Sequence, residues 1–480
     1  MTSADAASAN ARRLSVPGLI AFSTPGLCIG ALAIALGVFL PKYYAGHFGL
    51  GLAVVGGAFG AVRLIDMTFD PFIGVLMDHT KTRLGRYRPW LLLGAPVLML
   101  AVYMLFTPPV QPTYAWLIGW LFVYYIGTSL ITLSHASWAS VIAAKYHERS
   151  RVFGMIQLIS VIGATAVLVI PVIMERAGGG RSTAVPVMGA FVFFAVPLGV
   201  ILASTFTRER LVRSSEGERL RLGEYVEMIA RPDMLRIVIA DFCLALGPGW
   251  MSALYLFYFR ESRGFTISAA SLLLLIYVFA GVFGAGVLSR IAMRIGKHRT
   301  LMIAAMGYSL GLIALAMMPK GSMLLVAPFM FCMGFLASSF PLLDRAMVAD
   351  VGDAILLETG KHRAGLLYAM ITTVQKIAGA LSITLSFAVL AAVGYNAKDG
   401  FINTHAAIHG LELVYLIGPV VFVMLGGACF IGYKLDHKAH GAIREALDAR
   451  EAMMEPEPAI IESLSGSQTV PTHIAEPGIG

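Results

Sequence analysis

Long apolar runs alternate with short polar connections along the whole chain. Each of about twelve such runs approaches the roughly 20 residues that a helix needs to cross the hydrocarbon core of a bilayer. A β-barrel would show short segments of alternating polarity instead. The pattern therefore predicts an all-α membrane protein with twelve transmembrane helices. We place these spans at residues 17–41, 50–77, 89–108, 113–144, 152–174, 183–205, 234–259, 266–293, 300–318, 322–349, 364–394 and 411–434.

The longest polar connection divides these spans six and six. It predicts an N-terminal six-helix half, a cytoplasmic central loop, a C-terminal six-helix half and a cytoplasmic tail, at residues 1–205, 206–233, 234–435 and 436–480. Within the tail, a helix is expected up to about Met453. From Glu455 onward Pro, Ser, Gly and Glu dominate, and disorder is expected there.

The connections of the two halves contain similar residues at corresponding positions. Gly85-Arg86 after the second span corresponds to Gly296-Lys297 after the eighth, and Arg151 before the fifth span corresponds to Arg363 before the eleventh. The two correspondences have nearly the same offset. They favour a duplicated six-helix unit, as in transporters that consist of two related halves.

Basic residues are divided unevenly between the two sides of the predicted bundle. Most lie before the first span, in alternate connections and after the last span. Because cytoplasmic loops are enriched in Lys and Arg, both termini are predicted to be cytoplasmic. The same enrichment accounts for the net charge of +8, which does not indicate nucleic-acid binding. The connections on the opposite side carry only Lys42, Arg176, Arg181, Arg260, Arg263, Lys320 and Lys398.

Composition excludes several classes of function. The chain is 58% hydrophobic and 13% charged, whereas soluble domains are about 25% charged. Four cysteines lie in apolar spans and are interpreted as core residues, not as disulfides or metal ligands: Cys28, Cys243, Cys332 and Cys429. We find neither a Walker-type loop nor a catalytic or metal-binding spacing. A secondary transporter is therefore favoured over an ATP-driven pump, an enzyme or a scaffold.

Two carboxylates lie inside the second apolar run. Asp66 and Asp70 are four residues apart, so they share one helix face. Burying them is costly unless a partner or water compensates the charge, so the pair predicts a cation or proton site. Lys376 lies deep in the eleventh run and is a candidate partner. The alternative is that Arg63 and Lys376 pair with the acids only to hold helices together.

The residues around this pair resemble a known family. A long block in and after the second span and a shorter block after the tenth are similar to the glycoside–pentoside–hexuronide:cation symporters, the melibiose-permease-like branch of the major facilitator superfamily. The blocks read Arg63-x2-Asp66-x3-Asp70-Pro71-x2-Gly74-x3-Asp78-x-Thr80 with Gly85-Arg86-x-Arg88-Pro89-Trp90, and Ala349-Asp350-x2-Asp353 with Thr359-Gly360-Lys361-x-Arg363-x-Gly365.

The resemblance implies the major facilitator fold and uptake coupled to H⁺, Na⁺ or Li⁺ by alternating access. It implies that Asp66 and Asp70 bind the coupling cation with Lys376 as a partner, and that the two aspartates are metal ligands if the cation is Na⁺. Phe69, between the two acids, departs from the family pattern because it offers no oxygen to a metal ion. This departure favours H⁺ over Na⁺.

The resemblance also implies a cytoplasmic gate of ion pairs between two loops. In this gate Asp350, Asp353 and Arg363 oppose Arg149 or Arg151. The alternative is that these loop charges form a solvated surface. Nearby, Asp344 and Arg345 are expected to make local or gate pairs.

Candidate substrate contacts lie in the fourth, seventh and eleventh spans. Sugar-binding family members carry one carboxylate in the first span and one in the fourth, and this chain has neither; the fourth-span position falls on Ser134. Aromatic faces stack on sugars, but core packing is the alternative reading of each. Gly247-Pro248-Gly249 predicts a break in the seventh helix, and broken spans often line a cavity. Asp241, before this motif, is an unassigned acid. The candidates are Tyr124, Ser134, His135, Trp138, Trp250, Thr373 and Gln375.

Together these observations predict a secondary active transporter that couples H⁺ or Na⁺ to symport of a sugar or glycoside. The alternative substrate is a non-sugar amphiphile such as a lysolipid. We expect a monomer in a bacterial inner membrane, in contact with lipid, with no cofactor, no nucleic-acid partner and no enzymatic activity.

Overall fold

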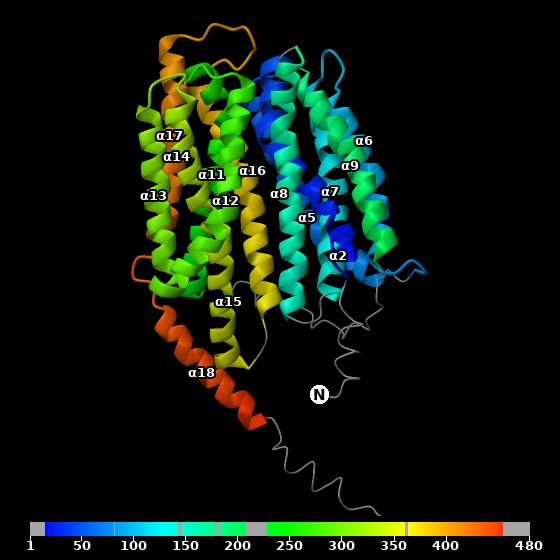
Figure 1. Cartoon of the computed structure of the whole chain (residues 1–480), viewed down its shortest axis with the longest axis vertical. Helices are drawn as coiled ribbons and strands as arrows, with labels where there is room; N and C mark the ends of the chain where they lie inside the picture. Colours follow the sequence, from blue (N-terminus) through cyan, green and yellow to red (C-terminus); the bar gives the residue numbers. More distant parts are fainter. Residues whose placement is uncertain are drawn as a thin grey trace, which may run out of the picture.

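The computed structural model describes residues 15–80, 82–142, 146–178, 183–207, 228–360 and 363–454. Twelve helical segments within these ranges are long and apolar enough to cross a membrane, which confirms the predicted number of spans. They form two groups that lie side by side (Figure 1). We call the end of the bundle that carries the C-terminal helix α18 the inner end, and the opposite end the outer end. That the inner end faces the cytoplasm stays a prediction.

The N-terminal half begins with a composite first span and continues with five long helices. The first span joins two α-helices, a π-helical turn, one more α-helical turn and a second π-helical turn. These are α2 (Val16–Ser23), α3 (Pro25–Ile34), η1 (Ala35–Phe39), α4 (Leu40–Lys42) and η2 (Tyr43–His47). The long helices are α5 (Leu52–His79), α6 (Arg88–Phe106), α7 (Tyr114–Ile142), α8 (Tyr146–Arg176) and α9 (Ala184–Phe206).

The C-terminal half also consists of six spans. Its first span also ends in a π-helical turn, and its fourth is divided into two helices. The elements are α11 (Pro232–Phe257) with η3 (Tyr258–Ser262), α12 (Ile267–Ile295), α13 (Lys297–Met317), α14 (Met323–Ala337) with α15 (Ser339–Thr359), α16 (Ala364–Ala392) and α17 (His405–Ala428). The predicted tail helix is present as α18 (His437–Met454). The predicted disorder after it, and most of the predicted central loop, lie outside the described residues.

Structural detail supports the echo between the halves that the sequence suggested. Gly85 and Gly296, which correspond in the sequence, both have positive φ, at 112° and 95°. L side chains rarely adopt this conformation, so glycine suits both positions. The π-helical turns η2 and η3 likewise end the first span of each half at the outer end.

Two spans differ from their predicted limits for local reasons. The tenth was predicted to end at residue 349, but α15 runs ten residues further, to Thr359, and carries Asp350 and Asp353 beyond the apolar run. The twelfth begins at His405 and not at residue 411. There the Thr404 side chain accepts a hydrogen bond from the Ala407 amide at 3.2 Å and caps the helix start.

The predicted break in the seventh span is wrong, because α11 is continuous through Gly247-Pro248-Gly249. The two glycines serve helix packing instead. A Cβ at Gly247 would lie 2.6 Å from the Val423 side chain on α17, and one at Gly249 would lie 2.9 Å from Ser382 on α16. The motif therefore lets α11 approach two neighbouring helices closely.

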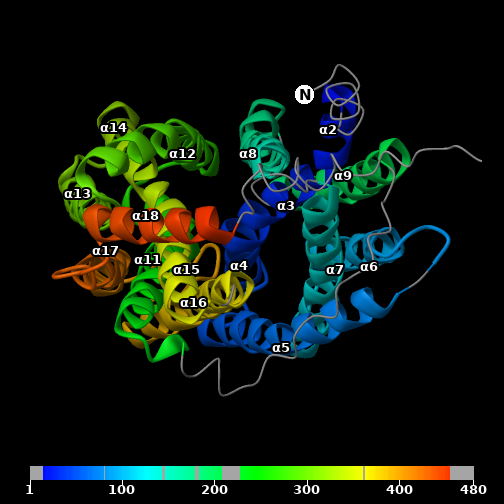
Figure 2. The same ribbon diagram turned by 90° about the horizontal axis from the view of Figure 1, so that it is seen from below.

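The two halves meet along the helix pairs α5 with α16 and α8 with α12, and η1 and α4 of the first span also contact α11. Viewed from the inner end, these pairs lie on opposite sides of the molecule, with the first span between them (Figure 2). The Thr384 hydroxyl of α16 donates a hydrogen bond to the Gly56 carbonyl of α5 at 2.9 Å. A Cβ at Gly60 would lie 2.0 Å from the same hydroxyl. Small residues on α5 thus place the two backbones close enough for side chains further along to pair.

Candidate functional site

A cluster of four charged side chains joins the two halves on the α5–α16 contact. The Lys376 ammonium of α16 forms an ion pair with the Asp70 carboxylate of α5. Its Nζ is also 3.7 Å from Asp66 Oδ2. The Arg63 guanidinium donates to the same Oδ2 at 3.2 Å. Two carboxylates and two bases therefore balance one another between the halves.

The two aspartates have unequal surroundings. Asp66 is 1% exposed, and its Oδ1 accepts a hydrogen bond from the Ser129 hydroxyl of α7 at 3.1 Å. Arg63 in turn stacks over the Tyr125 ring, with its Cζ 4.7 Å from the ring centroid. The Asp70 Oδ1 atom is buried and has no hydrogen-bond partner among the described residues. Asp70 thus holds the free acceptor of the cluster.

Ser129 belongs to this site, although sequence reasoning missed it. A serine in an apolar helix most often bonds to its own backbone, as Ser134 does when its hydroxyl donates to the Leu130 carbonyl at 2.6 Å. No pattern in the sequence distinguishes Ser129 from such a serine. Its hydroxyl is the third oxygen that sequence reasoning could not find beside the two carboxylates. In the described residues, however, no group of three or more His, Cys, Asp or Glu side chains could hold a metal ion.

The candidate substrate residues of the fourth span lie in packing contacts. His135 is 2% exposed, and its Nε2 is 2.8 Å from the Phe22 carbonyl oxygen. Trp138 is fully buried against the edge of Phe22, and Arg88 lies over its ring. Tyr124 is also buried. These contacts fit the core alternative for the three residues, while their substrate role stays a prediction.

The candidates of the seventh and eleventh spans are divided between packing and polar contacts. The Trp250 indole donates to the Val414 carbonyl at 3.0 Å and packs against α17. The Gln375 amide donates to Asp241 Oδ1 at 2.9 Å. Thr373 is half-buried on α16, three residues before Lys376. Of this group, Gln375 and Thr373 lie nearest in the sequence to the charge cluster.

The acids of the predicted gate have partners within their own half. Asp350 accepts from Lys297 of α13 at 2.6 Å, and His440 of α18 lies 3.0 Å from Asp353. Arg444 of α18 is 3.7 Å from Asp353. Figure 2 shows α18 lying across the inner end of the C-terminal half.

The arginines predicted to oppose these acids do not show whether ion pairs of the gate join the two halves. The side chain of Arg149 lies outside the described residues, and Arg151 and Arg363 have interactions of their own. A gate pair across the halves therefore stays a prediction. The neighbouring expectation for Asp344 is wrong, because neither carboxylate oxygen of Asp344 has a hydrogen-bond partner in the described part of the chain.

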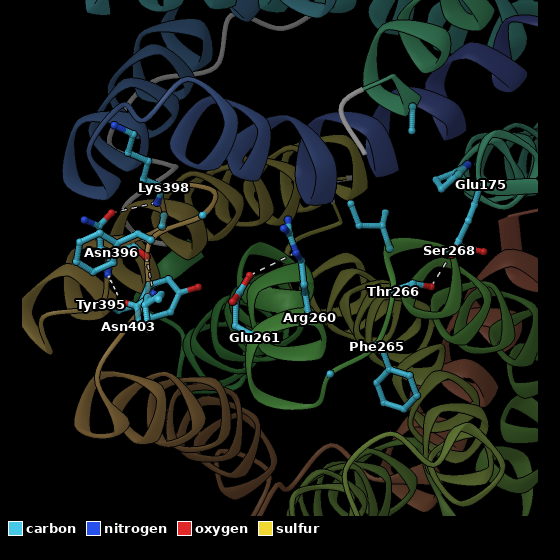
Figure 3. A pocket seen from close by; sticks show the side chains of 18 of the residues that line it. Glu175, Arg260, Glu261, Phe265, Thr266, Ser268, Tyr395, Asn396, Lys398 and Asn403 are labelled. Atoms are coloured by element: carbon cyan, nitrogen blue, oxygen red, sulfur yellow. Dashed lines mark hydrogen bonds and ion pairs between the residues drawn. The ribbon is translucent and has the colours of Figure 1, made fainter. Parts of the chain in front are cut away.

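At the outer end the halves are held by hydrogen bonds around a polar cavity of about 680 Å³ (Figure 3). The Asp399 amide donates to the Gly46 carbonyl at 2.8 Å, and the Thr266 hydroxyl donates to Glu175 at 3.3 Å. Burial raises the pKa of the Tyr395 hydroxyl in this cavity, and the Glu261 carboxylate adds to the shift. These contacts close the outer end between the halves.

Comparison with protein families decides the affiliation. A family model described as "MFS/sugar transport protein" matches residues 21–437. The chain belongs to this family. It is therefore a transporter of the major facilitator superfamily and not an enzyme. The resemblance derived from the Asp66 and Asp350 blocks is confirmed.

Several characterised or named transporters are similar over most of their length. The isoprimeverose transporter of Lactiplantibacillus pentosus is 25% identical, over 83% of this chain and 84% of the relative. The glucuronide carrier protein homolog of Escherichia coli (strain K12) is 24% identical, over 88% and 93%. An uncharacterized symporter of Bacillus subtilis (strain 168), YnaJ, is 24% identical, over 92% and 97%.

Solved structures support the fold. A variant of the nucleoside transporter NupG superposes with a TM-score of 0.64 at 13% identity, covering 87% of this chain and 98% of that one. A bacterial homolog of the human lysosomal transporter Spinster, in an inward-facing and unoccupied conformation, gives 0.62 at 13% identity, covering 87% and 97%. The predicted major facilitator fold of two six-helix halves is confirmed.

Proposed function

We propose that the protein is a secondary active symporter that couples the entry of H⁺, with Na⁺ as the second candidate, to the uptake of a sugar or glycoside by alternating access. The observation that carries the proposal is the ion pair between Asp70 and Lys376. It joins α16 of one half to α5 of the other. A pair of this kind links the occupation of a site to the relative position of the halves.

In the proposed cycle a cation competes with Lys376 for the aspartates. With the acids empty, Lys376 neutralises them and holds α16 against α5. A proton or Na⁺ on Asp70 removes the attraction for the ammonium, so α16 can move. A ligand shifts such an equilibrium only by its difference in affinity for the two conformations, and the competition with Lys376 supplies that difference. Asp66 would keep its contacts with Arg63 and Ser129 while Asp70 exchanges its partner.

A sugar or glycoside as substrate is supported by the relatives, which include isoprimeverose, glucuronide, lactose and raffinose carriers. The chain lacks the first-span and fourth-span carboxylates of sugar-binding family members. We therefore expect the sugar to contact uncharged donors and acceptors such as Thr373 and Gln375. This difference favours a substrate other than a simple galactoside.

The proposal is tested with protein reconstituted into liposomes that contain a pH-sensitive dye. Pools of monosaccharides, disaccharides and aryl glycosides are added outside, with and without Na⁺. Acidification of the lumen with one pool, in the absence of Na⁺, supports proton-coupled sugar symport. Uptake of a labelled sugar only in the presence of Na⁺ would assign the other ion. If no sugar changes the lumenal pH or is taken up, and a lysolipid stabilises the protein against thermal unfolding, the sugar assignment is overturned.

Asp70→Asn provides the site-specific arm of this experiment. It should abolish gradient-driven accumulation while sugar exchange between the two sides continues, since exchange does not require the cation to leave. Asp448→Asn on α18 is the matched control, because that carboxylate is 63% exposed and, among the described residues, pairs only with Arg444 of the same helix. Normal accumulation by Asp70→Asn would remove Asp70 from the coupling site.

A further inference from the structure

A second pair of buried acids lies in the C-terminal half, away from the cluster on α5. Asp241 of α11 is 2% exposed and Asp344 of α15 is fully buried. The two residues lie on helices that pack against each other. Neither lies on the contact between the halves, and the proposed coupling mechanism uses neither.

This pair lacks the compensation that the first pair has. Both oxygens of Asp344 and the Oδ2 of Asp241 are buried without a hydrogen-bond partner in the described part of the chain. The only hydrogen bond described for the pair joins the Gln375 amide to Asp241 Oδ1. An ionised carboxylate that is buried without a base or a hydrogen-bond donor is costly in an apolar interior, and protonation removes that cost. The burial of the pair and its missing partners therefore favour at least one proton on it.

The charged and titratable groups around the pair do not replace that proton. On α15, Arg345 interacts with Asp241, but its side chain is exposed. After α17, Cys429 and Tyr433 interact with Asp344, and neither supplies a positive charge. From α13 and α18, Lys297 and His440 pair with Asp350, further along α15, and from α16 Lys376 pairs with Asp70. Among the residues that the structure describes, no base forms a hydrogen bond with Asp344.

A short path connects this pair to the coupling site. Gln375 and Lys376 are neighbours on α16, yet their side chains reach opposite ways, Gln375 to Asp241 within the C-terminal half and Lys376 to Asp70 of the other half. An amide can donate to a carboxylate or accept from a protonated carboxyl group, so Gln375 responds to the proton load of Asp241. A change at one pair therefore reaches the other through a single turn of α16.

We propose that Asp241 and Asp344 form a second protonation site, which holds one proton in the conformation described here and exchanges it with water when α16 moves. The ion of this site is H⁺, since α11, α15 and α16 pack against one another here and, in the described residues, no group of three or more His, Cys, Asp or Glu side chains could hold a metal ion. With this site, the proposed symporter has two cation sites instead of one. The role of the second site in transport rests on the proposed function. The presence of the proton is a separate claim that needs no substrate.

The proton is tested by infrared difference spectroscopy on the reconstituted protein, titrated with H⁺ alone. The wild type should show the carbonyl stretch of a protonated carboxyl group at neutral pH, and the band should disappear in alkaline solution. Asp344→Asn should remove this band, while Asp66→Asn and Asp70→Asn should retain it. In Asp241→Asn the repulsion is gone, so Asp344 should lose its proton at a lower pH than in the wild type.

Two results would overturn the proposal. One is a wild-type spectrum without a protonated carboxyl band at neutral pH. The other is a band that persists in Asp344→Asn and is unmoved in Asp241→Asn. Because both measurements are made without a sugar or a gradient, they stand whether or not the liposome experiment detects symport. If the liposomes show no symport but the infrared band of the protonated carboxyl group is present, the proposed function is overturned and the proton site remains.

Discussion

The protein buries two pairs of aspartates, and it treats them in opposite ways. Asp66 and Asp70 are balanced by Arg63 and Lys376, and one of the bases comes from the other half of the molecule. Asp241 and Asp344 lie within one half, and in the described residues they share only one neutral donor. The same residue type is therefore stabilised by charge pairing in one place and requires a proton in the other.

This difference indicates that the two pairs respond to different changes. An ion pair between the halves depends on the distance between them, so the first pair responds to conformation. A carboxyl group without a base depends on the supply of protons, so the second pair responds to pH and to hydration. A transporter that needs both signals can obtain them from four aspartates, provided that one helix, α16, contacts both pairs.

Lys376→Met should have the largest effect, because it removes the base between the two halves. Breaking a buried ion pair from one side costs ~3–5 kcal/mol, as the remaining charge is left uncompensated. We expect a large fall in the midpoint of thermal unfolding and loss of accumulation. Adding Asp70→Asn to the same chain should recover most of the stability, since it removes the charge that Lys376 neutralised.

The double-mutant cycle of these two substitutions measures the pairing itself. Lys376→Met, Asp70→Asn and the combined variant are compared by thermal unfolding in the same detergent. A strongly non-additive result is expected for residues in contact. Additive effects would mean that the ammonium and the carboxylate do not pair in solution, and the contrast between the two acid pairs would collapse.

Asp344→Asn should behave in the opposite way, with little loss of stability at neutral pH. The substitution mimics a carboxyl group that already carries its proton. In the unfolded chain this carboxyl group loses its proton at about pH 4, whereas the folded protein holds it to a higher pH, so the stability of the wild type falls as the pH rises from about 4 until the buried group ionises. Thermal unfolding across a pH series should show this decline in the wild type and a flatter profile in Asp344→Asn. Parallel profiles would argue that Asp344 carries no proton.

Gln375→Leu tests the connection between the two pairs and should have a moderate effect. It leaves Asp241 Oδ1 without its donor, and a buried group that loses its partner costs roughly 1–3 kcal/mol. The cost should be smaller when Asp241→Asn is present, because the acceptor then carries no charge. The comparison is made by thermal unfolding of the two single variants and the double variant. If Gln375→Leu lowers the stability equally with and without Asp241→Asn, Asp241 carries no charge in the folded protein.

The sequence allowed the twelve spans and the first acid pair to be predicted, each for a physical reason. A bilayer requires long apolar runs, and those runs are visible in any single chain. Asp66, Asp70 and Lys376 stood out because charged residues in such runs are expensive. The motif around them pointed to the family. Their pairing was one of the readings left open, and the structure places all three together.

Contacts between distant helices could not be predicted in this way. Asp344 lies about a hundred residues after Asp241, and only the packing of α15 against α11 brings the two together. The glycines around Pro248 read as a break because sequence shows a missing amide but not the neighbouring helices that need the space. Packing and sugar stacking both stayed open for Trp138 in the sequence for the same reason, since the exposure of an aromatic face depends on what covers it.

Ser129→Ala should have the smallest effect and still separates two readings of the first pair. Asp66 loses a hydroxyl donor but keeps Arg63 and Lys376, so a cost of about 1 kcal/mol is expected. Ser271→Ala is the matched control, because this serine is fully buried and, among the described residues, its hydroxyl donates only to the Ile267 carbonyl of its own helix. If Na⁺ is the coupling ion, the Ser129 oxygen is needed as a ligand, and Ser129→Ala should raise the Na⁺ concentration required for uptake. If H⁺ is the coupling ion, the two variants should accumulate sugar equally, because a proton needs one carboxylate and no third oxygen.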